Sequence, residues 1–307
     1  MNNVSKAVMN VFRFTVLVAM AMALTIQLAG VSSSCAYRGT QVANAEASAR
    51  SGDAPRGESA AGIGSEETQQ DDFRWRGTIA AGRVVEIKGV NGSIRAEPSA
   101  GGDTEVTAEK RGRRSDPQSV RVQVVEHADG VTICAVYPSS DANKPNTCEP
   151  GDSGRSQVRD NDVKVDFTVR VPAGVRFSGR TVNGGVDANS LGADTDVHTV
   201  NGDVRVSTSG VARARTVNGS INASLGRADW TSPLDFKTVN GSITLLLPAA
   251  ASAEVRAETV NGDISTDFPI TIQGRFSKRS LNGTIGGGGR ELRLATVNGS
   301  IEIRRAQ

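Results

Sequence analysis

The residues of this chain that could carry chemistry are few and scattered. His127 and His198 are its only histidines, and no cysteine accompanies either of them in a metal-ligand pattern. The run Asp160-Asn161-Asp162 resembles part of a calcium loop but lacks the glycine and the distal glutamate that such a loop requires. Nucleophile elbows and phosphate-binding loops are absent from the sequence as well. We therefore expect no catalytic residues, no metal site and no cofactor.

Two cysteines, Cys134 and Cys148, are separated by 14 positions. In an exported chain the surroundings permit a disulfide, and we predict one between these two residues. Closing a loop of that length would stabilise the fold by roughly 3 kcal/mol. Two buried free thiols are the alternative.

A repeat of six letters, Thr-Val-Asn-Gly-x-Ile/Val, indicates the elements that must position any functional group. Seven of its eight copies follow one another at intervals of 16–22 residues, and the first copy stands far upstream. Such a period is typical of a solenoid, whose coils stack so that equivalent side chains meet in columns. We expect each asparagine of the repeat to lie in a turn and to stack on its neighbours. These residues are Asn91, Asn183, Asn201, Asn218, Asn240, Asn261, Asn282 and Asn298.

The fold class predicted from the repeat is all-β. β-Branched residues around Asn-Gly pairs also indicate β-hairpins, so a series of independent hairpins is the alternative. The nearly even spacing favours a β-solenoid, similar to a parallel β-helix, with coils of 16–22 residues. An aromatic content of 4% agrees with such thin, repetitive structure. A β-strand segment precedes the repeats, with strands expected at 84–87, 120–125, 131–136 and 163–171 and a surface loop at 138–162.

Three segments divide the chain. In residues 1–45, Lys6 and Arg13 precede an apolar run at 14–31, which predicts a signal sequence or an uncleaved membrane anchor. Lipidation of Cys35 is a third interpretation. Residues 46–72 are rich in small and polar residues and predict a disordered linker. Residues 73–307 form the repeat domain.

The balance of charge excludes one class of partner. Removing residues 1–45 would discard three of the 35 basic residues and no acid, which leaves 32 − 33 = −1. This balance gives no support for nucleic-acid binding.

The repeats resemble the bacterial putative-adhesin β-strand-repeat family, which is long catalogued as a domain of unknown function. The resemblance includes the predicted N-terminal signal and the segment before the repeats, Val171-Pro172-Ala173-Gly174-Val175. The resemblance covers roughly residues 73–305. It implies an envelope-associated β-solenoid without established catalysis, and it brings no catalytic residues to this sequence.

Carboxylates in the repeat column after glycine are a candidate for sugar cleavage. Only Asp203 and Asp263 are acidic there, and stacking in sequence order places them three coils, or about 14 Å, apart. Paired glycosidase carboxyls lie about 5–9.5 Å apart, so this column cannot supply the pair. Asp194, Asp196 and Asp267 lie in other columns, where we expect solvated surface groups.

The column three residues before each asparagine is the strongest binding candidate. Stacked coils would align its cations on one face at about 4.8 Å per step. Such a stripe could bind acidic polysaccharide or an anionic envelope surface, and an ordinary solvated face is the alternative. The cations are Lys88, Arg180, Arg215, Lys237 and Arg279, in a column that also holds His198, Glu258 and Ala295.

These patterns predict an exported, non-enzymatic protein that binds or scaffolds at the cell envelope through a repetitive surface. A hydrolase or lyase acting on envelope glycans is one alternative. A regulatory or sensory envelope domain, held in the membrane by residues 14–31 if they stay uncleaved, is the other.

Overall fold

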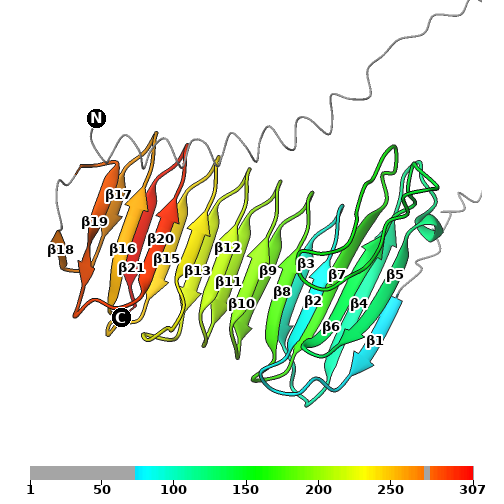
Figure 1. Cartoon of the computed structure of the whole chain (residues 1–307), viewed down its shortest axis with the longest axis horizontal. Coiled ribbons are helices and arrows are strands. Elements are labelled where there is room, and N and C mark those ends of the chain that lie inside the picture. Colours follow the sequence, from blue (N-terminus) through cyan, green and yellow to red (C-terminus); the bar gives the residue numbers. More distant parts are fainter. Residues whose placement is uncertain (1–72, 273–276, 307) are drawn as a thin grey trace, which may run out of the picture. The chain divides into compact units, whose positions relative to one another are not determined.

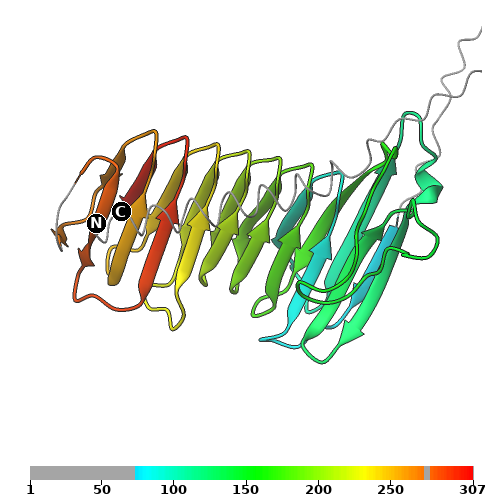
Figure 2. The same ribbon diagram turned by 45° about the horizontal axis from the view of Figure 1, so that its top comes forward.

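The computed structural model describes residues 73–272 and 277–306, and this part of the chain is almost entirely β-structure (Figure 1). Its strands form two large sheets, which face each other as two layers (Figure 2). The predicted signal or anchor at 1–45 and the linker at 46–72 lie outside the described residues. Within the described ranges, no helix is both long and apolar enough to cross a membrane.

Sheet A has ten strands in the spatial order β1-β4-β7-β3-β9-β11-β13-β15-β21-β17. Only β1 with β4 and β4 with β7 are antiparallel neighbours; the other pairs are parallel. The strands are β1 (Phe73–Gly77), β3 (Ile94–Pro98), β4 (Thr104–Arg111), β7 (Lys164–Val171), β9 (Val186–Leu191), β11 (Val204–Thr208), β13 (Ile221–Leu225), β15 (Ile243–Leu247), β17 (Ile264–Thr266) and β21 (Ile301–Arg305).

Sheet B has eleven strands in the order β18-β19-β16-β20-β14-β12-β10-β8-β2-β6-β5. Its central strands are parallel, and antiparallel pairs close both ends. The strands are β2 (Val84–Lys88), β5 (Arg121–His127), β6 (Gly130–Val136), β8 (Arg176–Arg180), β10 (Thr195–His198), β12 (Ala212–Arg215), β14 (Leu234–Lys237), β16 (Ala253–Glu258), β18 (Ile270–Ile272), β19 (Ser280–Ile285) and β20 (Glu291–Ala295). A short 3₁₀ helix, η1 (Pro117–Ser119), precedes β5.

Each coil takes one strand from each sheet. The chain runs along a strand of sheet B, turns through a Thr-Val-Asn-Gly copy, follows a strand of sheet A and returns by a loop to the next coil. The β-solenoid prediction is therefore confirmed. Strands β2, β5, β6 and β7 correspond to the four strands expected upstream of the repeats, and residues 138–162 form the expected loop.

Alternation along the strands fills the space between the sheets. Strand β13 is typical, because Ile221, Ala223 and Leu225 are buried and the residues between them face outward. Ile221 stacks in register on Ile243 of β15, and both are fully buried. Burying such a side chain contributes roughly 1.5–3 kcal/mol, so the apolar columns are the main source of stability.

The Thr-Val-Asn-Gly copies that connect sheet B to sheet A form the repeated corner. Hydrogen bonds between coils stabilise this corner. The side-chain amide of one asparagine donates to the side-chain oxygen of the asparagine in the neighbouring coil. Asn201 donates to Asn183 at 2.8 Å, and Asn218 donates to Asn201 at 2.7 Å. Each threonine is buried, and its hydroxyl donates to a glycine carbonyl of the adjacent coil, as Thr199 does to Gly184 at 2.7 Å. The motif letters therefore have structural roles.

The glycine of the motif is required by close contact between coils. A Cβ atom at Gly202 would lie 2.2 Å from the carbonyl oxygen of Gly184, far inside a van der Waals contact. The corner therefore excludes any side chain at this position. This explains why glycine follows every asparagine of the ladder.

The order of the coils differs from the order of the sequence. The last coil, β20 with β21, lies between the coil of β14 and β15 and that of β16 and β17. The asparagine ladder accordingly runs 91-183-201-218-240-298-261. Asn282 is outside it, because it lies in β19, which runs antiparallel to β16. The prediction of a turn at Asn282 is wrong: β19 reverses direction, and its copy of the motif becomes part of a strand.

Candidate functional site

The predicted basic column exists over five adjacent strands of sheet B. Lys88, Arg180, His198, Arg215 and Lys237 are consecutive partners in the parallel register. Ala295 of β20 and Glu258 of β16 follow them. Arg279 is not in the column, because Ser280 occupies the position opposite Glu258. Arg279 lies instead in the turn before β19, where it is exposed.

Most cations of this column already have partners. Lys88 Nζ donates to the carbonyls of Glu149 and Ser153, and burial lowers the pKa of this amine. Arg180 forms ion pairs with Glu86 and Asp152. The first two members of the stripe therefore hold protein structure in place.

The segment that Lys88 and Arg180 hold is the 138–162 loop. The structure contains the predicted disulfide between Cys134 and Cys148, with Cα atoms 5.7 Å apart, which ties this loop to β6. The backbone N–H of Gly151 donates to Glu86 Oε2 at 2.9 Å. Because Lys88 and Arg180 also contact the segment, the loop is fixed against the outer face of sheet B.

A cavity of about 510 Å³, the roofed pocket, lies where this loop meets sheet B. Its lining includes Pro150 and Gly151 of the loop, together with Glu86, Arg176, Ser178, Asp196 and Arg213 of sheet B, Asp194 directly before β10, and His127 and Asp129 from the β5–β6 hairpin. Asp194 and Asp196, which we expected as solvated groups, thus line a pocket. The pocket brings together residues from six strands or loops that are far apart in the sequence.

Both histidines of the chain hydrogen-bond beside the roofed pocket. Thr132 Oγ1 donates to the buried Glu86 carboxylate at 2.8 Å. His127 Nε2 lies 3.1 Å from Thr132 Oγ1 and is therefore placed to donate to that hydroxyl oxygen. His198 Nε2 lies 2.7 Å from Asp196 Oδ1. Burial alone would raise the pKa of Asp196, but the hydrogen bond and charge of His198, with Arg180 and Arg213, lower it. Asp196 is therefore held as a carboxylate.

A cluster of cations lies on the outer face of sheet B beyond the roofed pocket. This cationic patch consists of Arg213 and Arg215 on β12, Lys237 on β14, Arg293 on β20 and Arg256 on β16. They are register neighbours on adjacent strands, so their side chains emerge on the same face.

Four cations of the cationic patch pair with only two carboxylates. Arg215 and Lys237 share the carboxylate of Asp235, at 2.6 and 2.9 Å. Arg293 and Arg256 share that of Glu291, at 2.5 and 3.6 Å. The hydrogen bond from Arg293 lowers the pKa of Glu291 and keeps it charged. Arg213 Nε donates to the carbonyl of Pro233, and Asp196 is its register partner on β10. Glu254 and Glu258 flank Arg256 on the outer face of β16.

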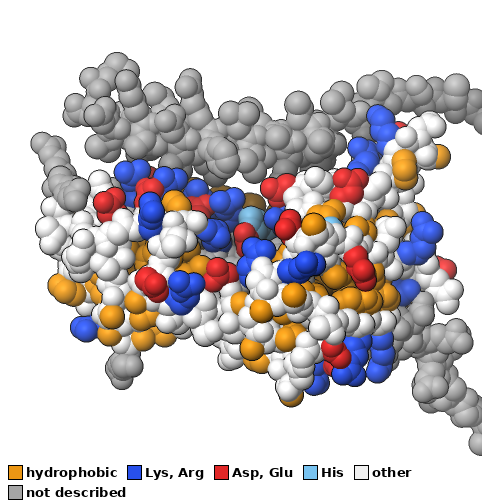
Figure 3. All heavy atoms as spheres, turned by 60° about the horizontal axis from the view of Figure 1, so that its bottom comes forward, with side chains coloured by type: hydrophobic (Ala, Val, Ile, Leu, Met, Phe, Trp, Pro, Cys, Tyr) orange, Lys and Arg blue, Asp and Glu red, His pale blue; other side chains and the backbone are white. Residues whose placement is uncertain are grey.

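The surface view agrees with this mixed but dense charge. Figure 3 shows Lys and Arg side chains gathered with Asp, Glu and histidine in one band, beside an area where apolar and uncharged groups predominate. Such a face offers many donors in rows with regular spacing. It suits weak, repeated contacts with an extended ligand better than binding at a single point.

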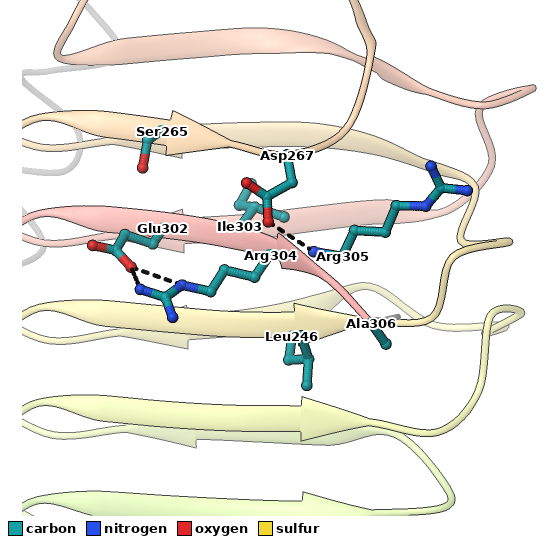
Figure 4. Close-up of a pocket in the computed structure, with 8 residues that line it drawn as sticks. All are labelled: Leu246, Ser265, Asp267, Glu302, Ile303, Arg304, Arg305 and Ala306. Carbon is teal, nitrogen blue, oxygen red and sulfur yellow. Dashed lines mark hydrogen bonds and ion pairs between the residues drawn. The ribbon is translucent and has the colours of Figure 1, made fainter.

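Another hollow lies on the outer face of sheet A at β15, β17 and β21 (Figure 4). It has a volume of about 800 Å³ and includes Asp267. Arg304 pairs with Glu302, and the backbone N–H of Arg305 donates to Asp267 Oδ2, whereas the Arg305 guanidinium points away from both carboxylates.

Asp203 and Asp263 are farther apart than the sequence order implies. Because the β21 coil is inserted between β15 and β17, four steps separate these two residues, or about 19 Å. The conclusion that this column lacks a glycosidase pair is unchanged.

Sequence reasoning missed three of the five cations of the patch, namely Arg213, Arg256 and Arg293. The signal was available, because residues two apart on a strand share a face. The column five positions before each asparagine would have given these arginines as well as Glu86, Asp196 and Asp235. No pattern in the sequence indicates that the coil of β20 and β21 is inserted between two earlier coils. This insertion places Arg293 between Asp235 and Arg256.

Comparison with solved structures finds bacterial proteins of low sequence identity. A "putative cell adhesion protein" from Clostridium sporogenes is 8% identical, with a TM-score of 0.42, and covers 76% of this chain and 100% of its own. A "putative adhesin" from Bacteroides fragilis is 14% identical, with a TM-score of 0.34 and coverage of 76% and 97%. Another, from Parabacteroides distasonis, is 11% identical, with a TM-score of 0.25 and coverage of 76% and 98%.

Among curated proteins, none matches this chain. Residues 176–304 match the family described as Toastrack DUF4097. This range begins at β8 and ends in β21, so it contains the regular coils, the asparagine ladder from Asn183 onward and the whole cationic patch. Over these residues the chain is similar to the Toastrack DUF4097 family.

Proposed function

We propose that this protein is exported and acts, without catalysis, as an adhesin-like binding or scaffolding protein of the cell envelope. The cationic patch carries the proposal: five cations lie on four adjacent strands of an open face, and four of them pair with only two carboxylates. Its ligand is an acidic polysaccharide, whose negative groups recur along a chain as the cations recur along the solenoid. The disulfide and the N-terminal apolar run support export.

The cations of the patch suit multiple weak contacts. Arg215 and Lys237 keep 49% and 41% of their side-chain surface exposed while they share Asp235. Each guanidinium or ammonium therefore retains donors for a second anion. Because such exposed charges are screened within about 8 Å at physiological ionic strength, binding should weaken steeply as salt is added.

The test is binding of the full-length protein to alginate, an acidic polysaccharide, and to dextran, a neutral one, at low and high salt. The triple variant Arg213→Gln, Arg215→Gln, Arg293→Gln leaves Lys237 to pair with Asp235 and Arg256 to pair with Glu291. Three lost contacts of about 0.5 kcal/mol each predict roughly tenfold weaker binding to alginate.

A matched variant controls for the loss of total charge. Arg74→Gln, Arg95→Gln, Arg170→Gln removes three exposed cations from β1, β3 and β7 of sheet A. We expect it to bind alginate as the wild type does. Equal affinity of the two triple variants, or equal binding of dextran and alginate, would contradict the proposal.

The roofed pocket supports a second candidate function, hydrolysis of an envelope glycan. It places Asp194, Asp196 and the hydrogen-bonded His127 around one cavity. Incubating the full-length protein with acidic and neutral glycans tests this candidate. Release of reducing ends that is lost in the Asp196→Asn variant would favour the hydrolase over the binding protein.

A further inference from the structure

A second, smaller hollow lies at the ends of the strands opposite the repeated corner. Its volume is about 450 Å³, within the range of sites for small ligands. Three connections that enter sheet B form it: the segment 226–233 before β14, Ser252 before β16 and the glycine-rich segment 286–290 before β20. The hollow is lined by residues that do not repeat from coil to coil.

Trp230 lines this hollow and has an unused hydrogen-bond donor. Its side chain is buried, with 7% of the residue exposed, and its indole Nε1 has no hydrogen-bond partner. A buried tryptophan N–H ordinarily finds an acceptor, since leaving one unpaired costs about 1–3 kcal/mol. Nε1 itself has less than 1 Å² of accessible surface, so a ligand oxygen reaches it through a small shift of the ring and then supplies the missing acceptor.

Other free donors surround the same space. The Arg290 side chain is exposed and forms no ion pair among the described residues, and the Gly289 amide has no acceptor there either. A Cβ at Gly289, where φ is +143°, would lie 3.1 Å from the Ser252 carbonyl oxygen, so glycine keeps this backbone open. The one carboxylate of the lining, Asp229, lies 3.7 Å from Arg227. Donors outnumber acceptors, which favours a ligand rich in acceptors.

The hollow borders the cationic patch. Arg213 of the patch donates from Nε to the carbonyl of Pro233, in the connection that carries Trp230. Arg290 precedes Arg293 by three residues along the same extended segment, a distance of about 10 Å. One polymer chain lying on the patch can therefore reach into the hollow.

We infer that this hollow binds the carboxylate of a uronic-acid unit within an acidic polysaccharide. The carboxylate accepts from the Trp230 indole N–H, the Arg290 guanidinium and the Gly289 amide. Hydrogen bonds from such donors to a carboxylate are among the stronger ones in proteins. The inference rests on the proposed function, because the polysaccharide is the ligand of the neighbouring patch.

The two tryptophans of the chain provide a direct test. Trp75 lies in β1, at the opposite end of sheet A, so ¹⁵N-labelled full-length protein gives two indole N–H signals, which Trp230→Phe assigns. On titration with a galacturonic-acid tetramer, we expect the Trp230 signal to shift and that of Trp75 to stay. Trp230→Phe, which replaces the indole by a smaller aromatic ring without a donor, should weaken binding about tenfold, and Trp75→Phe should not change it.

The outcomes separate this inference from the proposed function. If the tetramer binds and moves backbone signals of the patch, but the Trp230 indole signal stays, the inference is wrong and the proposed function stands. Absence of any binding contradicts both. An equal shift with a neutral glucose tetramer would show that the hollow does not recognise a carboxylate. An equal shift with inorganic phosphate or with anionic phospholipid vesicles would show that the anion does not have to belong to a polysaccharide. Loss of the shift in Arg290→Gln, with alginate binding retained on the patch, supports the inference.

Discussion

The repeated corner and the segments that do not repeat differ in how their polar groups are used. At the corner, threonine hydroxyls and asparagine amides hydrogen-bond to the same groups of the next coil. In the non-repeating segments, Trp230 Nε1 is unpaired, and the 138–162 loop roofs a pocket. Repetition therefore marks what holds the coils together, and the unpaired indole and the roofed pocket lie where the repeat is broken.

The largest effect should follow from a charge in the apolar column beside the corner. Ile243 is fully buried, so Ile243→Asp places an unpaired carboxylate between the sheets and should cost several kcal/mol or unfold the array. Arg215→Ala is the control. It leaves Lys237 on Asp235 and should cost about 0–1 kcal/mol. Equal melting temperatures of the two variants would show that the assignment of inner and outer columns is wrong.

Removing the disulfide tests the non-repeating side. Cys134→Ala with Cys148→Ala should lower the free energy of unfolding by about 3 kcal/mol, because the segment 134–148 is no longer closed into a loop in the unfolded chain. Urea unfolding measures this change. Hydrogen exchange should show the Gly151 amide, which donates to Glu86, losing protection before the corner amides do. Uniform loss of protection would mean that the loop and the coils unfold as one unit.

A side chain at the corner glycine tests the close approach of coils. Gly202→Ala places a Cβ against the carbonyl of Gly184 and should cost about 2 kcal/mol through displaced backbone. Gly101→Ala, where a Cβ meets nothing within 4 Å, is the matched control and should leave stability nearly unchanged. Thermal melting of both variants decides the matter, and a stable Gly202→Ala protein would contradict the contact.

The asparagine ladder should contribute less, because it is exposed to water. Asn218→Ala removes one bond donated to Asn201 and one accepted from Asn240, at a cost of about 1–2 kcal/mol. Asn282→Ala, outside the ladder, should have little effect. If the two substitutions destabilised the protein equally, the ladder would have no energetic role.

The smallest effect concerns pH at the roofed pocket. The pKa of Asp196 is lowered from 3.8, so its charge stabilises the folded state above that value and loses this effect as the pH falls through the lower folded pKa. The difference in unfolding free energy between wild type and Asp196→Asn should therefore be present at pH 6 and shrink below pH 4. A difference that does not change with pH would show that the charge of Asp196 is not what stabilises the pocket.

The sequence by itself determined the corner and the alternation of the strands, and it predicted the disulfide that the structure contains. These are local or periodic features: Asn-Gly fixes the turn, Ile or Val three residues after each asparagine faces the core, and two cysteines in an oxidising compartment can pair. The basic column from Lys88 to Lys237 follows from the same periodicity.

Only the tertiary structure decided which coils are neighbours and which cations are free. The coil of β20 and β21 enters between earlier coils, and β19 reverses direction, so Asn282 and Arg279 leave their expected columns. Lys88 and Arg180 are used by the 138–162 loop, whose path no repeat encodes. The physical reason is that strand pairing is satisfied by any edge with matching hydrogen bonds and apolar columns. Sequence proximity therefore does not specify the partner, whereas long-range packing does.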